Sequence, residues 1–211
     1  MIGKTTIPAL AVARALALAP AMLALPLAGC ISLGAKPPKA LLTLTSAQSV
    51  PAGTIQSSAA SPTITILVPA VPQSLATARV PVQAGDVAIA YVTDAVWVEA
   101  PQRMFARVMA DTIAARTGRV VLSSAQSFQD PGARLSGELR NFGIDATGGG
   151  ATGVALVTFD ATLTRGEAGK FEKRRFEARV PVAIVDATTV GPALNDAANK
   201  VAAQVADWVG K

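Results

Sequence analysis

The side chains that perform most protein chemistry are scarce in this chain. Its 211 residues include a single cysteine, Cys30, and no histidine. Histidine is the commonest general base and metal ligand, so Ser-His pairs, Cys-His pairs and histidine-bound metals are removed. A lone cysteine forms neither an intrachain disulfide nor a cysteine zinc cluster. We therefore expect a protein that is not an enzyme, with no catalytic, cofactor-binding or metal-binding residues, whose thiol accepts a covalent group.

Cys30 ends the motif Leu27-Ala28-Gly29-Cys30, which resembles the lipobox of bacterial lipoproteins. The motif follows Lys4 and an apolar run over 15–27, the order found in a secretion signal. In such lipoproteins the signal peptide is cut before the cysteine, the thiol takes a diacylglycerol and the new amino group is acylated. The resemblance implies that residues 1–29 are a signal peptide and that Cys30 carries both N-acyl and S-diacylglycerol groups. Two or more acyl chains give stable membrane anchoring.

Two other interpretations of this segment are weaker, and the choice of membrane is a separate prediction. The apolar run 15–27 would span about 20 Å as a helix, short of the hydrocarbon core, which disfavours a permanent transmembrane anchor. An ordinary secretion signal with an incidental cysteine stays open. Ile31 stands where an aspartate would retain an enteric lipoprotein in the inner membrane. We expect anchoring in the outer membrane, facing the periplasm, with inner-membrane anchoring as the alternative.

The charge of the chain gives little support to nucleic-acid binding. The net charge is +5, and the first 29 residues contribute Lys4 and Arg14 but no acid, which leaves +3 on the remainder. That excess is mild, and no run of lysine or arginine is interleaved with aromatic residues. We therefore expect no nucleic-acid partner.

Two groups of residues suggest a site, but each has a simpler structural explanation. Asp86, Asp94 and Glu99 lie close in sequence and could form a carboxylate pair, but nothing fixes their geometry. We expect them to be surface or capping residues. The sequence TGGGATG at 147–153 suggests a phosphate-binding loop, but a strand pattern follows it where a helix would be needed. A hairpin turn is favoured.

A charged run and two tryptophans also admit two interpretations each. The run 170–179 could contact acidic lipid head groups or an acidic partner. Its alternation with Phe176 and Ala178 favours the solvated face of a strand that resists edge pairing. Trp97 and Trp208 could bind a partner or lipid, but we expect them to pack between helix and sheet.

Hydrophobic periodicity predicts a single α+β domain over residues 62–211. Alternating residues predict strands at 63–68, 79–83, 86–92, 119–124, 133–145, 154–165 and 171–185, and helical spacing predicts helices at 98–117 and 191–210. We expect a two-layer sandwich: a mainly antiparallel sheet with two amphipathic helices packed on one face. Residues 30–61 are expected to be the lipidated N-terminus and a flexible spacer, with a short strand at 40–45 as an option.

Two local predictions concern the sheet. In 133–145, Leu135 and Leu139 follow one alternation while Phe142 and Ile144 follow the other. One extra residue near Asn141, a β-bulge, would place all four on one face. The segment 79–83 contains a proline, so we expect it to be an edge strand.

With these elements placed, the chain resembles the ABC-type transport auxiliary lipoproteins, the group that includes the PqiC-like proteins. The shared features are the lipobox, the segment LLTL, the strand leading into VPAVPQSLATARV, and YVTDAVWVEAPQRMFARVMADTIAAR, followed by the hairpin and a C-terminal Ala/Val helix. The resemblance covers about 40–210, and the best matches are Pro72, Leu75, Arg79, Trp97 and Pro101. The chain departs from the family at Leu41, where tyrosine is frequent, and in the residues between Trp97 and Pro101.

The resemblance implies a non-enzymatic periplasmic component that docks on partner proteins. Relatives resemble partners of MCE-domain proteins, which work with an ABC permease and ATPase to move lipids between the two membranes. Homo-oligomers are left open. Two alternatives also remain: an accessory lipoprotein for outer-membrane biogenesis without a transport role, and a tethered hydrolase that uses serine or carboxylates. The hydrolase predicts a concave pocket with convergent polar groups and shifted carboxylate pKa values.

Overall fold

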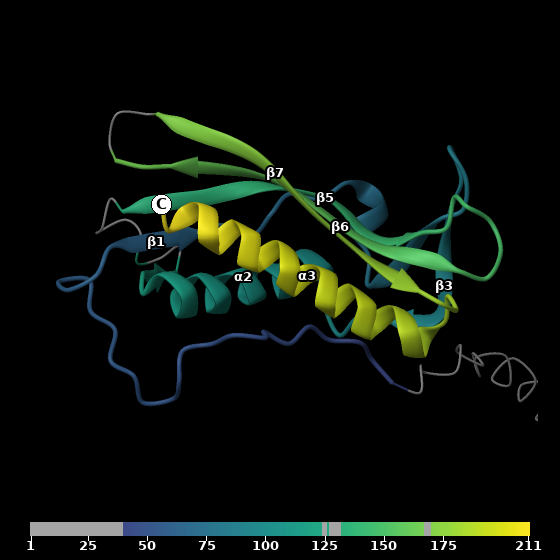
Figure 1. Ribbon diagram of the computed structural model, residues 1–211, viewed down its shortest axis with the longest axis horizontal. Coiled ribbons are helices and arrows are strands. Elements are labelled where there is room, and N and C mark those ends of the chain that lie inside the picture. Colours follow the sequence, from purple (N-terminus) through teal and green to yellow (C-terminus); the bar gives the residue numbers. More distant parts are fainter. Residues whose placement is uncertain (1–39, 124–125, 127–131, 167–169) are drawn as a thin grey trace, which may run out of the picture. The chain divides into compact units, whose positions relative to one another are not determined.

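The computed structural model of the chain describes residues 40–211 except 124–125, 127–131 and 167–169. The predicted signal peptide and Cys30 lie outside the described residues. The described part is an α+β domain in which a seven-stranded sheet carries two helices on one face (Figure 1). This confirms the predicted fold class and the two helices.

The sheet is organised around one long strand. The strands are β1 (Thr63–Ile66), β2 (Arg79–Gln83), β3 (Ile89–Val96), β4 (Val120–Leu122), β5 (Ala133–Asp145), β6 (Gly153–Thr164) and β7 (Phe171–Val182). Along one edge, β5 pairs with β6, which in turn pairs with β7. Along the other edge, the first part of β5 pairs with β1 and its last residues pair with β2.

The expectation of a mainly antiparallel sheet is wrong in half of the molecule. The β5–β6–β7 hairpins and the β2–β3 pair are antiparallel, but β1 is parallel to both β4 and β5, and β2 is parallel to β5. Hairpins join neighbours in sequence, whereas parallel strands need long crossovers, here through a helix or another hairpin. The alternation within one short strand carries no information about such distant partners.

The strand β2 is not the edge strand that its proline suggests. It lies between β3 and β5 in the sheet. Its ladder with β5 contains only Val82 and Gln83, and its pairing with β3 is irregular between Arg79 and Pro81. Pro81 therefore lies where the sheet does not need its missing N–H group.

The predicted bulge in β5 is present. Leu139 is opposite Phe159 and Asn141 is opposite Thr158, so Arg140 is the extra residue. Because of this insertion, Leu135, Leu139, Phe142 and Ile144 are all buried. They face the two α-helices together with alternate residues of β6 and β7, and the other face of these strands carries neither of these α-helices (Figure 1).

The two helices pack against each other on the sheet. Helix α2 (Pro101–Thr117) begins with a proline and ends at Gly118, which has a left-handed φ of 67°. Helix α3 (Ala187–Val209) begins four residues earlier than predicted. The side chain of Asp186 accepts hydrogen bonds from the backbone N–H groups of Thr188 and Thr189, a capping box that fixes the start. Pro192 therefore lies inside the helix.

Candidate functional site

A segment before the sheet, Leu42–Gln48, lies against the two helices and is called the strap here. Leu42 forms a parallel β-bridge with Trp97. The Leu42 N–H donates to the Val96 carbonyl at 2.7 Å, and the Leu42 carbonyl accepts from the Val98 N–H at 2.9 Å. The side chain of Leu42 also reaches Gly191 near the start of α3. The short strand that the sequence suggested at 40–45 is thus a single β-bridge at Leu42.

Two asparagines one turn apart on α3 hold the strap by its backbone. Asn195 accepts from the Thr45 N–H at 2.9 Å, and Asn199 accepts from the Ala47 N–H at 2.7 Å. Asn199 also donates to the Thr45 carbonyl at 2.9 Å, and Ser46 donates to Asp111 of α2 at 2.6 Å. Since most of these contacts recognise backbone, they fix the position of the strap more than its sequence.

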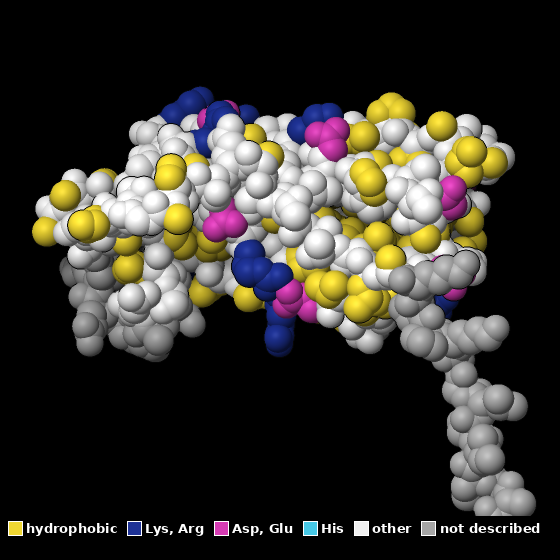
Figure 2. All heavy atoms as spheres, turned by 90° about the horizontal axis from the view of Figure 1, so that it is seen from below, with side chains coloured by type: hydrophobic (Ala, Val, Ile, Leu, Met, Phe, Trp, Pro, Cys, Tyr) yellow, Lys and Arg dark blue, Asp and Glu magenta, His cyan; other side chains and the backbone are white. Residues whose placement is uncertain are grey.

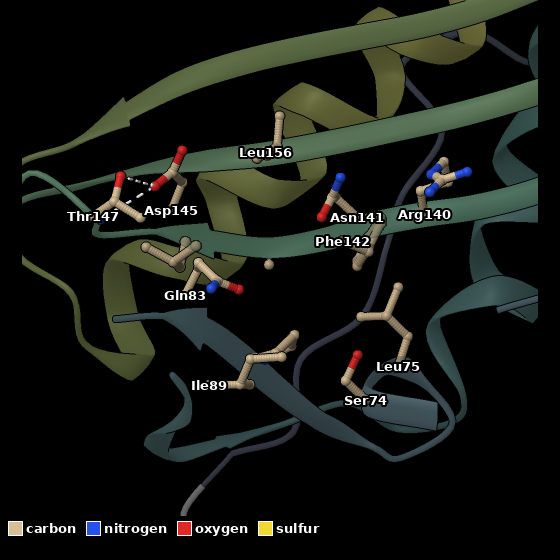
Figure 3. Close-up of a pocket in the computed structure, with 13 residues that line it drawn as sticks. Ser74, Leu75, Gln83, Ile89, Arg140, Asn141, Phe142, Asp145, Thr147 and Leu156 are labelled. Carbon is tan, nitrogen blue, oxygen red and sulfur yellow. Dashed lines mark hydrogen bonds between the residues drawn. The ribbon is translucent and has the colours of Figure 1, made fainter. Parts of the chain in front are cut away.

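The face of the sheet without helices carries a small pocket between the end of β5 and the β2–β3 hairpin. Its volume is about 220 Å³, and Figure 3 shows the side chains around it. Its lining includes the apolar Leu75, Pro81, Ile89, Phe142 and Leu156 and the polar Ser74, Gln83, Arg140, Asn141, Asp145 and Thr147. This volume lies below the roughly 300–1,000 Å³ of sites that enclose a drug-sized ligand. The pocket can take a side chain or a small group, but not a whole lipid.

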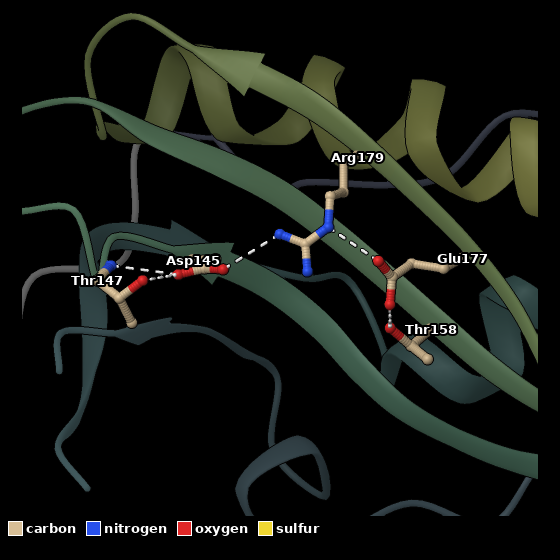
Figure 4. A network of polar contacts seen from close by, with 5 residues as sticks. All are labelled: Asp145, Thr147, Thr158, Glu177 and Arg179. Carbon is tan, nitrogen blue, oxygen red and sulfur yellow. Dashed lines mark hydrogen bonds and ion pairs between the residues drawn. The ribbon is translucent and has the colours of Figure 1, made fainter. Parts of the chain in front are cut away.

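A chain of polar contacts runs from this pocket across the helix-free face (Figure 4). Asp145 accepts from the Thr147 hydroxyl at 2.7 Å and from its N–H at 3.2 Å, and Arg179 donates to the same carboxylate at 3.3 Å. Arg179 also donates to Glu177 at 2.8 Å, and Glu177 accepts from Thr158 at 3.2 Å. The network ties β5, β6 and β7 together on their exposed side.

Polar contacts on this face lower the pKa values of two aspartates, Asp145 and Asp160. Hydrogen bonds from Thr147, and then Arg179, hold the pKa of Asp145 below its ordinary value. The bidentate contact with Arg175, at 2.5 and 2.7 Å, lowers the pKa of Asp160 in the same way, and Arg140 adds to it. A general acid or base needs a pKa near the working pH. The pKa values of both carboxyls are shifted, as the hydrolase alternative expects, but they are lowered and so lie further from the working pH.

The other residues singled out by the sequence have structural positions. Glu99 pairs with Arg107 of α2, which lowers the pKa of the carboxyl, whereas Asp86 and Asp94 are exposed in or near β3. No group of three or more His, Cys, Asp or Glu side chains that could hold a metal occurs among residues 40–211 outside the gaps given above. The sequence 147–153 forms the β5–β6 hairpin turn, where Gly149 and Gly150 have positive φ angles.

The charged run and the tryptophans follow the favoured interpretations. In β7, Phe176 and Ala178 are buried, while Lys173, Arg175, Glu177 and Arg179 are exposed. Arg175 pairs with Asp160 of β6, and Arg179 pairs with Asp145 of β5 and with Glu177 of its own strand. Trp97 is 1% exposed and packs on Phe142 with ring centroids 5.6 Å apart. Trp208 is 8% exposed and packs on Phe176 at 5.5 Å.

Sequence reasoning missed the strap contacts and the Asp145 network. The spacing of Asn195 and Asn199 places both on one face of α3, which was a usable signal, but their partners lie about 150 residues earlier. The contact between Asp145 and Arg179 depends on the register of three strands. Neither could be derived before the topology was known.

The described surface on the strap side mixes apolar and polar side chains. Figure 2 shows hydrophobic side chains there as small patches separated by polar and charged atoms. Exposed large apolar residues include Leu41, Ile55 and Val98. Single exposures of this kind are normal for a water-exposed surface. In the described part of the chain, none of the helices has the length and apolar character needed to cross a membrane.

Comparison with known proteins identifies relatives of this chain. The family model described as "ABC-type transport auxiliary lipoprotein component" matches residues 42–206. The crystal structure of protein XCC0632 from Xanthomonas campestris is similar, with a TM-score of 0.64 and 16% identity over 81% of this chain and 94% of that one. A crystal structure of an uncharacterized protein has a TM-score of 0.59 and 15% identity, covering 70% and 92%. At these identities the likeness shows the fold alone. No curated protein matches the sequence.

Proposed function

We propose a docking role for this chain, which belongs to the ABC-type transport auxiliary lipoprotein family. The family consists of auxiliary components of transport and is not a known enzyme family. As a lipoprotein, the chain is anchored to a membrane of the cell envelope. Within that frame, the chain acts as a periplasmic docking component. It contacts an MCE-domain protein and the ABC permease and ATPase of a system that moves lipid between the two membranes. The family match is the observation that carries this proposal.

The anchor of this component is Cys30, cleaved from residues 1–29 and acylated on its sulfur and its amino group. The outer membrane is the proposed location, because Ile31 follows the cysteine. About 12 residue steps separate Cys30 from Leu42, where the strap begins, so this part of the chain reaches at most about 40 Å. The domain thus works close to the membrane that holds it.

The helix-free pocket supports docking more than enclosure of a substrate. It is too small to bury a lipid, and its lining combines apolar groups with one carboxylate, Asp145, whose pKa is held below its ordinary value. Ile89 lies at its rim and is 53% exposed, so a side chain of a partner can cover it. Such a recess contributes a specific contact without covalent chemistry.

The test is affinity purification of the tagged full-length protein from detergent-solubilised envelopes, followed by mass spectrometry. We expect an MCE-domain protein and ABC subunits to be enriched over a tagged unrelated lipoprotein. The Ile89→Asp variant should recover less of them than Val68→Asp, a matched control because Val68 is 56% exposed and does not line the pocket. Recovery of no ABC or MCE subunit with the wild-type protein would refute the docking role.

A further inference from the structure

A second hollow opens at the opposite end of the domain from the start of the strap. Its volume is about 420 Å³, and its lining includes Ser58, Ser61, Arg119 and Arg165. The guanidinium group of Arg165 donates to the carbonyl of Val209 at 3.1 Å, so the hollow lies at the C-terminal end of α3. The loop at 58–61 therefore provides two serines to this hollow. Arg119, just before β4, and Arg165, just after β6, provide two arginines.

Arg119 lines this hollow, and no described residue provides it with a counter-ion. It follows Gly118 at the end of α2 and is half-buried. In the part of the chain that the structure describes, its guanidinium group has no hydrogen-bond or ion-pair partner. Burial, and then the positive charge of Arg165, lower the pKa of Arg119 from its ordinary value. The folded domain therefore holds a partly desolvated cation that an anion would stabilise.

The charge balance of the hollow fits a single negative charge. Arg165 is already paired with Glu172 at 3.0 Å, which compensates its charge. No described residue compensates the charge of Arg119. Its planar guanidinium group matches a carboxylate in a bidentate contact. Serine hydroxyl groups at Ser58 and Ser61 can donate further hydrogen bonds to the same oxygen atoms.

We propose that this hollow is a docking site for an acidic side chain of the partner protein, an inference that rests on the proposed function. An acidic side chain supplies the planar carboxylate that the guanidinium fork of Arg119 matches. Leu42 contacts Gly191 near one end of α3 and Arg165 contacts Val209 at the other, a separation of about 27 Å along the helix. The strap begins at the first end, and the hollow is at the far end, where a partner can approach.

The experiment is an NMR titration of the mature lipidated chain in detergent micelles, labelled with ¹⁵N-arginine. The probe is a capped tri-glutamate peptide at low ionic strength, where an exposed charge pair is least screened. A capped tri-glutamine peptide and inorganic phosphate at equal ionic strength are the comparison ligands. The Nε–H signals of Arg119 and Arg165 should shift saturably with the glutamate peptide and not with the glutamine peptide.

Variants separate a specific site from general charge attraction. Arg119→Gln should weaken the apparent affinity about tenfold or more. Arg134→Gln, which removes an exposed arginine outside the hollow, should leave the affinity unchanged. Equal shifts with both peptides, tighter binding of phosphate than of the glutamate peptide, or unchanged binding by Arg119→Gln would each overturn the proposal. If ABC or MCE subunits still copurify with the wild-type protein, only this site falls and the docking role stands.

Discussion

The two ends of helix α3 are completed in different ways. At its N-terminal end, Asp186 caps the helix and the strap supplies Leu42 against Gly191, while Asn195 and Asn199 hold the strap's backbone. At its C-terminal end, Arg119 lies in an open hollow with no partner among the described residues. The first end is satisfied by contacts within the described chain, whereas the proposal assigns an external carboxylate to the second. Loss of the strap contacts at the first end should therefore cost stability, whereas loss of Arg119 at the second end should cost binding.

The largest expected effect on the free energy of unfolding comes from replacing the two tryptophans. Trp97 lies beside the strap and is 1% exposed, whereas Trp208 lies in the last turn of α3 and is 8% exposed. Trp97→Ala should lower the free energy of unfolding by about 3–5 kcal/mol, and Trp208→Ala by about 2–3 kcal/mol, because the second cavity opens toward solvent. Urea unfolding of both variants measures the order. An equal or larger loss for Trp208→Ala would contradict the comparison.

Next in size is the attachment of the strap. The double variant Asn195→Ala/Asn199→Ala removes three hydrogen bonds to the strap backbone, and should lower the free energy of unfolding by about 1–2 kcal/mol. Hydrogen exchange at the Thr45 and Ala47 amides should accelerate. Asp196→Ala is the matched control, because Asp196 lies on the same helix and pairs only with Lys200 in the described structure. Unchanged exchange at Thr45 and Ala47 would mean that the asparagines do not hold the strap.

The cap of α3 gives a pH-dependent prediction. Hydrogen bonds from the Thr188 side chain, and then from the Thr189 and Thr188 N–H groups, lower the pKa of Asp186 in the folded state. A lowered folded-state pKa contributes stability above the unfolded value near 4, and this contribution is lost as the pH falls through the folded value. Asp186→Asn keeps a good N-cap but cannot titrate.

Thermal unfolding between pH 7 and pH 2.5 tests this. The melting temperature of the wild type should fall more steeply below pH 4 than that of Asp186→Asn, while the two differ little at pH 7. Parallel curves for the two proteins would show that the cap does not contribute to acid sensitivity.

The smallest expected effect compares two arginines near the C-terminal end of α3. Arg116 pairs with Asp207 through two nitrogen atoms, at 3.1 and 2.5 Å, whereas Arg119 is unpaired in the described structure. Arg116→Gln should lower stability by about 0.5 kcal/mol, and Arg119→Gln should leave it unchanged or raise it by a similar amount. Differential scanning calorimetry at low salt can resolve the sign. Destabilisation by Arg119→Gln would show that Arg119 has a structural role.

Local patterns predicted local structure. Alternation along β5, β6 and β7 gave the hairpins and the face that each residue occupies, and a phase change in that alternation located the bulge beside Asn141. The parallel pairing of β1 could not be predicted, because its partners β4 and β5 lie more than 50 residues away. The predicted start of α3 at residue 191 is four residues late, although Asp186 and Thr189 have the spacing of a capping box.

The candidate sites were less predictable than the fold. The pocket beneath Ile89 forms only when the β2–β3 hairpin lies beside the end of β5. The hollow at Arg119 similarly needs the loop at Ser58–Ser61 to lie beside the end of β6. Sequence patterns identify which side chains face solvent, but a site made from distant segments requires the topology.

The account depends on a domain that is tied to a membrane through Cys30, and the mass of the mature protein tests this directly. Intact-protein mass spectrometry of the chain purified from envelopes should show a polypeptide that begins at Cys30 and carries a diacylglyceryl group and a further acyl chain. The Cys30→Ser variant should lose both the added mass and its sedimentation with membranes. A mature wild-type chain without acyl groups, or membrane fractionation unchanged in Cys30→Ser, would contradict the account.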